Sequence, residues 1–186
     1  TENTAAYTLY LKGRNLWNKR GLENLKKAME YFELSVHEDP SFALGYAGQA
    51  DCAILLRGNW NIDPEENLAK ANAMLERALQ LDPALAEAHA TLGLVYTEEL
   101  NLRRAEEEFR KAIELKPSYA TAHQWYFLMM ASELRWDEAL KEIQKAVELD
   151  PLSGIIIQNL GAYYWARRDW QMAAEKFKKA IELGLE

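Results

Sequence analysis

The chain of 186 residues has little cysteine, few basic residues and no long apolar run. Its single cysteine, Cys52, excludes an intramolecular disulfide framework. The longest apolar run, from Trp125 to Ala131, has seven residues. A membrane-spanning helix needs about 20, so no membrane insertion is expected. Acidic residues outnumber basic ones by 29 to 22, and the net charge of −7 argues against binding to a nucleic-acid backbone.

The first residues also lack a targeting signal. The segment "TENTAAYTLY" has no initial methionine and no basic region followed by an apolar one. We interpret the chain as a fragment of a longer protein, whose targeting segments can lie outside it, and expect a cytoplasmic location. The hydrophobic content of 49% is sufficient for a real core, in either one compact domain or one elongated array.

Prolines mark a regular organisation. Four of the five follow similar endings, "HEDP", "QLDP", "ELKP" and "ELDP", and they lie 43, 34 and 34 residues apart. Each proline should end a helix, because it lacks a backbone N–H and disfavours helix in the preceding residue. A fixed spacing of this size indicates a repeat array.

Further columns of residues share this spacing. In each unit a small residue is followed four positions later by a large apolar residue, and three positions after that by another small one. The columns are Ala28, Ala71, Ala105, Ala139 and Ala173; Phe32, Leu75, Phe109, Ile143 and Phe177; and Ser35, Ala78, Ala112, Ala146 and Ala180. Such spacings lie on one helical face. An upstream set, Gly13, Ala50, Gly93, Phe127 and Gly161, predicts a second helix in every unit.

The sequence therefore predicts a single array of five units, at about 4–40, 41–83, 84–117, 118–151 and 152–186. The helices are predicted to start near residues 4, 22, 42, 64, 84, 101, 118, 135, 152 and 169. Units one and two have extra residues between the two column sets, so we expect a short turn between helices only in the last three units.

Two stretches resemble tetratricopeptide repeats, "LGLVYTEELNLRRAEEEFRKAIELKP" (92–117) and "LGAYYWARRDWQMAAEKFKKAIEL" (160–183). The resemblance covers nearly the whole chain, although Phe127 stands where the family has a small residue, and Ala53 and Met130 replace its usual tyrosine. It implies an all-α, right-handed α-solenoid of ten helices. More narrowly, "YLKGRNLWNKR", "YAGQAD" and "HQWY" are similar to arrays that follow regulatory or catalytic domains in bacterial signalling proteins.

The family's first helices line a concave inner surface, which holds a peptide or a partner segment. The resemblance, with the angular position of each residue, gives candidate groove residues: Tyr7, Tyr10, Arg14, Trp17, Asp51, Glu87, Thr91, Gln124, Trp125, Leu128, Gln158, Asn159 and Trp165. Leu44 and Glu98 share this side. Aromatic rings and amides together suit a peptide ligand. The alternative is that some of these residues only pack between neighbouring units.

Two tryptophans are candidates for a role other than core packing. Most of "HQWYFLMMASEL" (123–134) is expected to be core, with its methionines filling gaps, whereas Trp125 is expected to point away from it. Trp60 falls in a loop before the helix start Asp63–Pro64, where it can fold back or act as a contact anchor.

The charges on the expected groove disfavour one known ligand class. Chaperone-binding arrays of this family grip a terminal carboxylate with basic and amide side chains. Here Arg14 is the one basic residue expected in the lining, whereas Asp51, Glu87 and Glu98 are acidic. A neutral or basic apolar segment is therefore the better ligand.

The sequence offers little for catalysis. His89 and His123 are 34 residues apart and are expected to pack at equivalent places, and no metal-binding spacing accompanies them. The acidic run Glu106–Glu108 is interpreted as a solvated outer face. We expect no enzyme activity, no metal and no cofactor.

The predicted function is a protein-interaction scaffold, the regulatory or sensory part of a bacterial signalling protein. One alternative is a self-assembly module, which includes a homodimer through the apolar end of the last helix, around Trp170, Phe177 and Ile181. A third is a small-molecule sensor that uses a tryptophan-lined groove.

Overall fold

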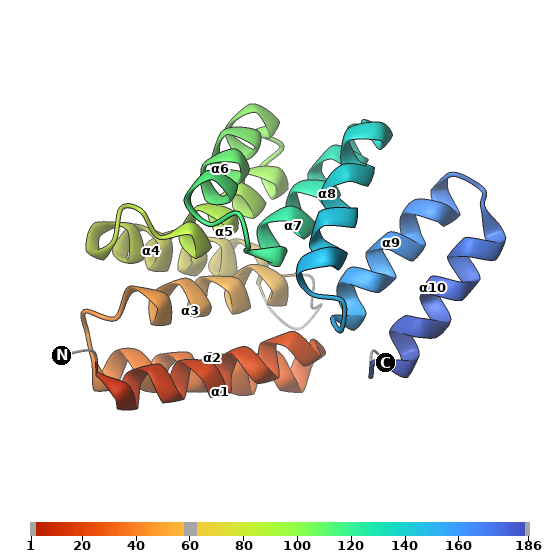
Figure 1. Ribbon diagram of the computed structural model, residues 1–186. Coiled ribbons are helices and arrows are strands. Elements are labelled where there is room, and N and C mark those ends of the chain that lie inside the picture. The colour runs from red at the N-terminus through yellow and green to blue at the C-terminus, as the bar shows by residue number, and fades with distance from the viewer. Residues whose placement is uncertain (1–2, 58–62, 185–186) are drawn as a thin grey trace.

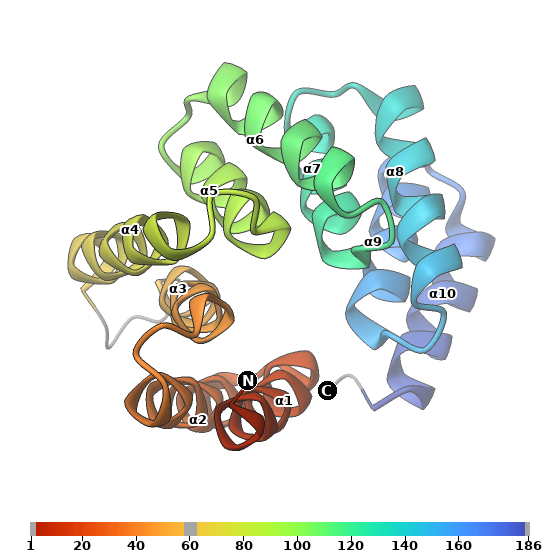
Figure 2. The same ribbon diagram turned by 60° about the vertical axis from the view of Figure 1, so that its left-hand side comes forward.

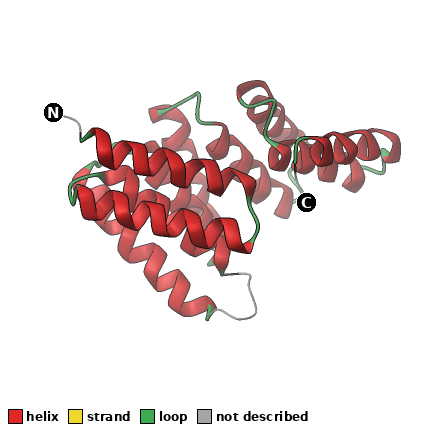
Figure 3. Cartoon of the chain, turned by 90° about the horizontal axis from the view of Figure 1, so that it is seen from below, coloured by secondary structure: helices red, strands yellow, loops and turns green. Residues whose placement is uncertain are grey.

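The protein is described by a computed structural model that covers residues 3–57 and 63–184 (Figure 1). Across these ranges there are ten helices and no strand, which confirms the all-α prediction (Figure 3). The helices are α1 (Thr4–Lys19), α2 (Leu22–Glu38), α3 (Ala43–Leu56), α4 (Pro64–Leu81), α5 (Ala86–Glu98), α6 (Leu102–Leu115), α7 (Ala120–Ser132), α8 (Trp136–Leu149), α9 (Gly154–Ala166) and α10 (Trp170–Glu182). Every predicted start is correct to within two residues.

The helix boundaries have local chemical causes. Asn3 and Asp63 cap α1 and α4, since each side chain accepts hydrogen bonds from two backbone N–H groups of the first turn. At their C-terminal ends, α5, α7 and α9 are followed by a residue with positive φ, which is Leu100, Leu134 and Arg168 respectively. The N–H of the next residue then bonds five residues back, as in Asn101 N to Tyr96 O at 2.8 Å. This pattern closes the end of a helix.

Unit one differs from the prediction. Its extra residues do not lengthen the connection, because only Arg20 and Gly21 separate α1 from α2. They lengthen the helices, so that α1 and α2 have 16 and 17 residues whereas α5 and α6 have 13 and 14. Near the end of α1, Trp17 contacts Trp125 of unit four.

The core lies between the two helices of each unit. All five alanines that begin the column pattern are buried. Beside them, the small residues of the first helices meet the large residues of the second. A Cβ on Gly93 would lie 2.8 Å from Phe109, and one on Gly161 would lie 2.7 Å from Phe177. Close helix contact at these points therefore depends on glycine, which has no side chain.

The units curve round a common centre. Seen along the array, the first helices α1, α3, α5, α7 and α9 lie inside and the second helices lie outside (Figure 2). The curvature brings the end of α1 to the start of α9 and the end of α10 (Figures 1 and 2). Asn18, Ser153 and Gly184 line one depression there, with a volume of about 280 Å³.

Candidate binding surface

The middle of the inner surface is filled by two tryptophans. Trp17 from α1 and Trp125 from α7 meet edge to face, with ring centroids 6.0 Å apart, and each is 2% exposed. The expectation that Trp125 points away from the core is therefore wrong. It does lie away from its partner helix α8, but α1 covers it because the array curves through three units. Sequence spacing carries no information on such a contact.

A buried polar cluster lies beside the tryptophans. Arg14 Nη1 donates to Asp51 Oδ2 at 2.7 Å, and Thr91 Oγ1 donates to Asp51 Oδ1. These three groove candidates come from α1, α3 and α5, so the cluster links units one, two and three. Burial raises the pKa of the Asp51 carboxyl, and the Arg14 charge opposes that shift. Inside the array the three residues of this cluster link three helices.

Two tyrosines border the same cluster. Tyr10 and Tyr119 are both buried, and burial raises the pKa of both phenols. Tyr10 also packs against Phe32 and Phe42, at centroid distances of 5.6 and 5.8 Å. Tyr10 thus belongs to the core of units one and two.

The remaining acidic groove candidates are paired. Lys116 Nζ lies 2.6 Å from Glu87 Oε1, and Arg57 Nη1 lies 2.8 Å from Glu98 Oε2. With Asp51 bound to Arg14, each acid expected to charge the groove has a basic partner. The inner surface is therefore less acidic than its first-helix residues indicate.

Open space remains on two sides of the filled centre. The α1–α5 depression has a volume of about 760 Å³ and lies at the starts of α1, α3 and α5. It is lined by Asn3, Thr4, Tyr7, Asp39, Ser41, Phe42, Ala43, Leu44, Leu81, Asp82 and Leu85. The α3–α7 depression has a volume of about 540 Å³ and is lined by Ile54, Leu55, Arg57, Pro64, Leu94, Glu98, Trp125 and Leu128.

The other candidates divide between these surfaces and the core. Tyr7 and Leu128 are exposed, one in each depression. Gln124 and Asn159 are buried, and Gln158 is exposed on α9. Trp165 is 60% exposed and meets Trp170, itself 57% exposed, at a centroid distance of 6.3 Å. Trp60 lies outside the described residues.

The two histidines occupy equivalent buried places, as the sequence predicted. His89 Nδ1 lies 2.6 Å from Glu108 Oε2, and its Nε2 lies 3.0 Å from Pro83 O. His123 repeats this arrangement with Glu142 at 2.6 Å and Pro117 at 3.1 Å. Each histidine therefore joins its own second helix to the preceding turn.

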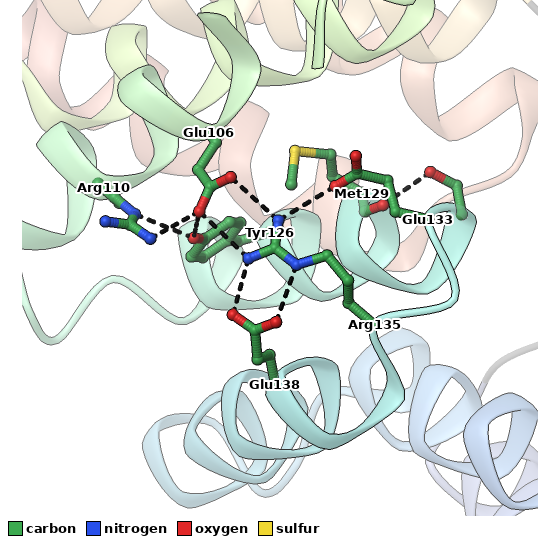
Figure 4. A network of polar contacts seen from close by, with 8 residues as sticks. Glu106, Arg110, Tyr126, Met129, Glu133, Arg135 and Glu138 are labelled. Carbon is green, nitrogen blue, oxygen red and sulfur yellow. Dashed lines mark hydrogen bonds and ion pairs between the residues drawn. The ribbon is translucent and has the colours of Figure 1, made fainter. Parts of the chain in front are cut away.

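The acidic run of α6 is not simply solvated, which corrects the prediction for two of its members. Glu108 binds His89, and Glu106 is the centre of a network across α6, α7 and α8 (Figure 4). Glu106 accepts hydrogen bonds from Arg135 at 3.0 Å, Arg110 at 2.6 Å and Tyr126 at 2.8 Å. The Arg135 hydrogen bond lowers the pKa of Glu106 to about 2.

The described residues offer little chemistry of other kinds. They contain no group of three or more His, Cys, Asp or Glu side chains placed to hold a metal ion. Cys52 is buried, and burial raises the pKa of its thiol, which leaves it a weak nucleophile. No helix in the described ranges has both the length and the apolar character needed to cross a bilayer.

Comparison with known proteins gives a match to one family model. The sequence model of the tetratricopeptide repeat matches residues 86–119, which include α5 and α6. No curated protein matches the sequence.

Solved structures share the fold. TTC0263, a thermophilic TPR protein in Thermus thermophilus, has a TM-score of 0.66 and 24% identity over 88% of this chain and 84% of that chain. YrrB, a TPR protein with an unusual peptide-binding site, has a TM-score of 0.53 and 23% identity over 98% and 88%. The APC/C hetero-tetramer Cut9–Hcn1 has a TM-score of 0.68 and 18% identity over 98% of this chain and 38% of that chain.

At these sequence identities the solved structures show the fold alone. The family model therefore identifies a tetratricopeptide repeat at residues 86–119, and the described residues share the fold of solved tetratricopeptide-repeat structures.

Proposed function

We propose that the chain is a non-catalytic interaction scaffold, a single array that holds a segment of a partner protein in the α1–α5 depression. The observation that carries this proposal is that the α1–α5 depression, with apolar and polar walls, is the larger of the two open depressions beside the filled centre. Large pockets with apolar walls and a few polar groups are the usual places for ligands. The finer resemblance to bacterial signalling arrays favours a regulatory setting for this scaffold.

The lining of the depression selects the chemistry of the partner. Tyr7, Phe42 and Leu44 supply aromatic and aliphatic contact area. The two charged residues among the lining, Asp39 and Asp82, are both acidic. Hydrogen bonds from Ser41 lower the pKa of Asp39, so its carboxylate is ionised at neutral pH. A segment with a large apolar side chain next to a lysine or arginine complements this lining.

Selection from a random peptide display library tests the proposal without a known partner. We expect enriched peptides to combine apolar and basic residues, and to lose binding to the variants Tyr7→Ser and Leu44→Ser. Leu128→Ser is the matched control, because Leu128 is also exposed but lies in the other depression. Peptides that bind all three variants equally would contradict this site.

Self-association is the second candidate function. The outer face of α10 carries Ile181, 69% exposed, and Trp170 at its start. An exposed apolar face of this kind suits contact with another copy. Analytical ultracentrifugation at several concentrations should show a dimer that Ile181→Lys disrupts. A constant monomer mass would exclude this candidate and leave the scaffold proposal intact.

A further inference from the structure

Two side chains with unused hydrogen-bond donors lie at the end of α1, outside both depressions. Arg20 is part-buried in the turn between α1 and α2, and its guanidinium lies 3.6 Å from the centroid of the Trp17 ring. Arg20 Nη1 is buried and has no hydrogen-bond partner among the described residues. A buried guanidinium nitrogen without an acceptor is costly, because burial removes the water that would otherwise bind it.

Trp17 provides a second buried donor without an acceptor. Its indole Nε1 is buried and also has no hydrogen-bond partner in the described part of the chain. The Arg20 guanidinium lies over this indole, so the two unused donors belong to side chains in contact. Both donors lack an acceptor, and a group with two oxygens offers one to each.

The charges near Trp17 indicate the charge of an acceptor that suits these donors. Arg14 lies 4.0 Å from the same ring centroid, but its charge is matched by Asp51. Within residues 3–57 and 63–184, Arg20 therefore has no ion-pair partner. Burial, followed by repulsion from Arg14, lowers the pKa of Arg20 to about 10. The local excess is one positive charge, which a single monovalent anion balances.

The backbone supports a specific role for Arg20. Its φ is 58°, a conformation that costs a residue with a side chain about 1 kcal/mol or more. Arg168 has the equivalent position in unit five, with φ 62°, but its side chain is exposed. A positive φ therefore recurs at this position, whereas the part-buried guanidinium over an indole ring belongs to unit one.

We propose that Arg20 and Trp17 form a binding site for one carboxylate, with the Arg20 guanidinium and the Trp17 indole N–H as its donors. Planar guanidinium groups match the two oxygens of a carboxylate, and charge-assisted hydrogen bonds are the stronger kind. The carboxylate belongs either to a small free acid or to a partner chain. The site differs from the α1–α5 depression and does not depend on the proposed function.

Nuclear magnetic resonance of the whole chain tests the site directly. The six tryptophans give indole N–H signals, and the variant Trp17→Phe identifies the one from Trp17. At constant ionic strength, sodium acetate should shift this signal in a saturable way, whereas its neutral analogue acetamide should not. Arg20→Gln should weaken the apparent affinity by about tenfold or more, the factor that loss of a charged hydrogen bond gives.

Controls separate this site from nonspecific effects. Arg168→Gln removes the same charge from the equivalent exposed turn and should leave the acetate response unchanged. N-acetyl-leucine compared with acetate distinguishes the sources, because a chain-end site binds the larger acid more tightly and a small-acid site does not. A Trp17 signal that ignores acetate, or that responds equally to acetamide or in Arg20→Gln, would overturn the proposal.

Discussion

At the scale of single residues, the fold depends on matched sizes across each helix pair. Gly93 faces Phe109 and Gly161 faces Phe177. In unit four the column residue of the first helix is Phe127, and the second helix has the smaller Ile143 in place of phenylalanine. Both are buried. The departure of Phe127 from the family pattern is thus compensated within its own unit.

This matching gives a prediction for Gly93→Ala. Alanine normally stabilises a helix by about 0.5–1 kcal/mol relative to glycine. Here its Cβ would lie 2.8 Å from the Phe109 ring, so overpacking of about 1–3 kcal/mol should prevail and lower the free energy of unfolding. Adding Phe109→Leu should recover part of the loss, because an Ala–Leu pair already occurs in unit two. Urea denaturation of both single variants and the double variant measures this; purely additive losses would refute it.

The turn residue Leu100 offers a stabilising change. Its φ is 58° and its side chain is 82% exposed, so little side-chain packing offsets the energetic cost of the left-handed conformation. Asparagine tolerates this conformation better, and Leu100→Asn should raise the free energy of unfolding by about 0.5–1 kcal/mol. Thermal and urea denaturation measure the change. The control Lys111→Asn, at an exposed position inside α6, should be neutral or slightly destabilising.

At the scale of elements, polar networks fix how neighbouring units meet. Arg135 at the start of α8 binds Glu106 of α6 and Glu138 of its own helix, at 3.0 and 2.7 Å (Figure 4). Tyr126 of α7 also donates to Glu106. Glu106 therefore holds units three and four together through three helices.

The Glu106 network predicts an acid dependence of stability. The pKa of Glu106 falls from 4.5 to about 2 on folding, so its contribution is present above pH 4.5 and is lost as pH falls towards 2. After allowance for solvent screening, the loss is about 1 kcal/mol. Denaturant unfolding at pH 7 and about pH 3 should show a smaller acid loss for Glu106→Gln. Glu107→Gln, at the exposed neighbour, should behave as the native chain; equal acid losses in both variants would contradict the assignment.

Helices and columns were predictable because they depend on local periodicity. The alanine columns, the prolines and the Asp63–Pro64 start mark the elements by residues close in sequence. The partners of Glu106 and Glu108 were not predictable in this way. An acidic residue on a helix surface looks the same in sequence whether it faces water or an arginine 29 positions away.

At the scale of the whole molecule, curvature determines the binding surface. The first-helix residues were assigned to the inner side by their angular position alone. That argument places Tyr7 and Leu128 in open depressions, but it cannot show that Trp17 and Trp125 cover each other. Small rotations between successive units add up along the array, and sequence spacing does not give their size.

The central claim is that units one and four touch at the inner surface and leave open space on either side. A double-mutant cycle on Trp17→Leu and Trp125→Leu measures that contact through the free energies of unfolding. We expect a coupling energy of about 0.5–1.5 kcal/mol, as for other aromatic pairs in contact. Losses that add to within about 0.3 kcal/mol, as for distant residues, would contradict the closed centre.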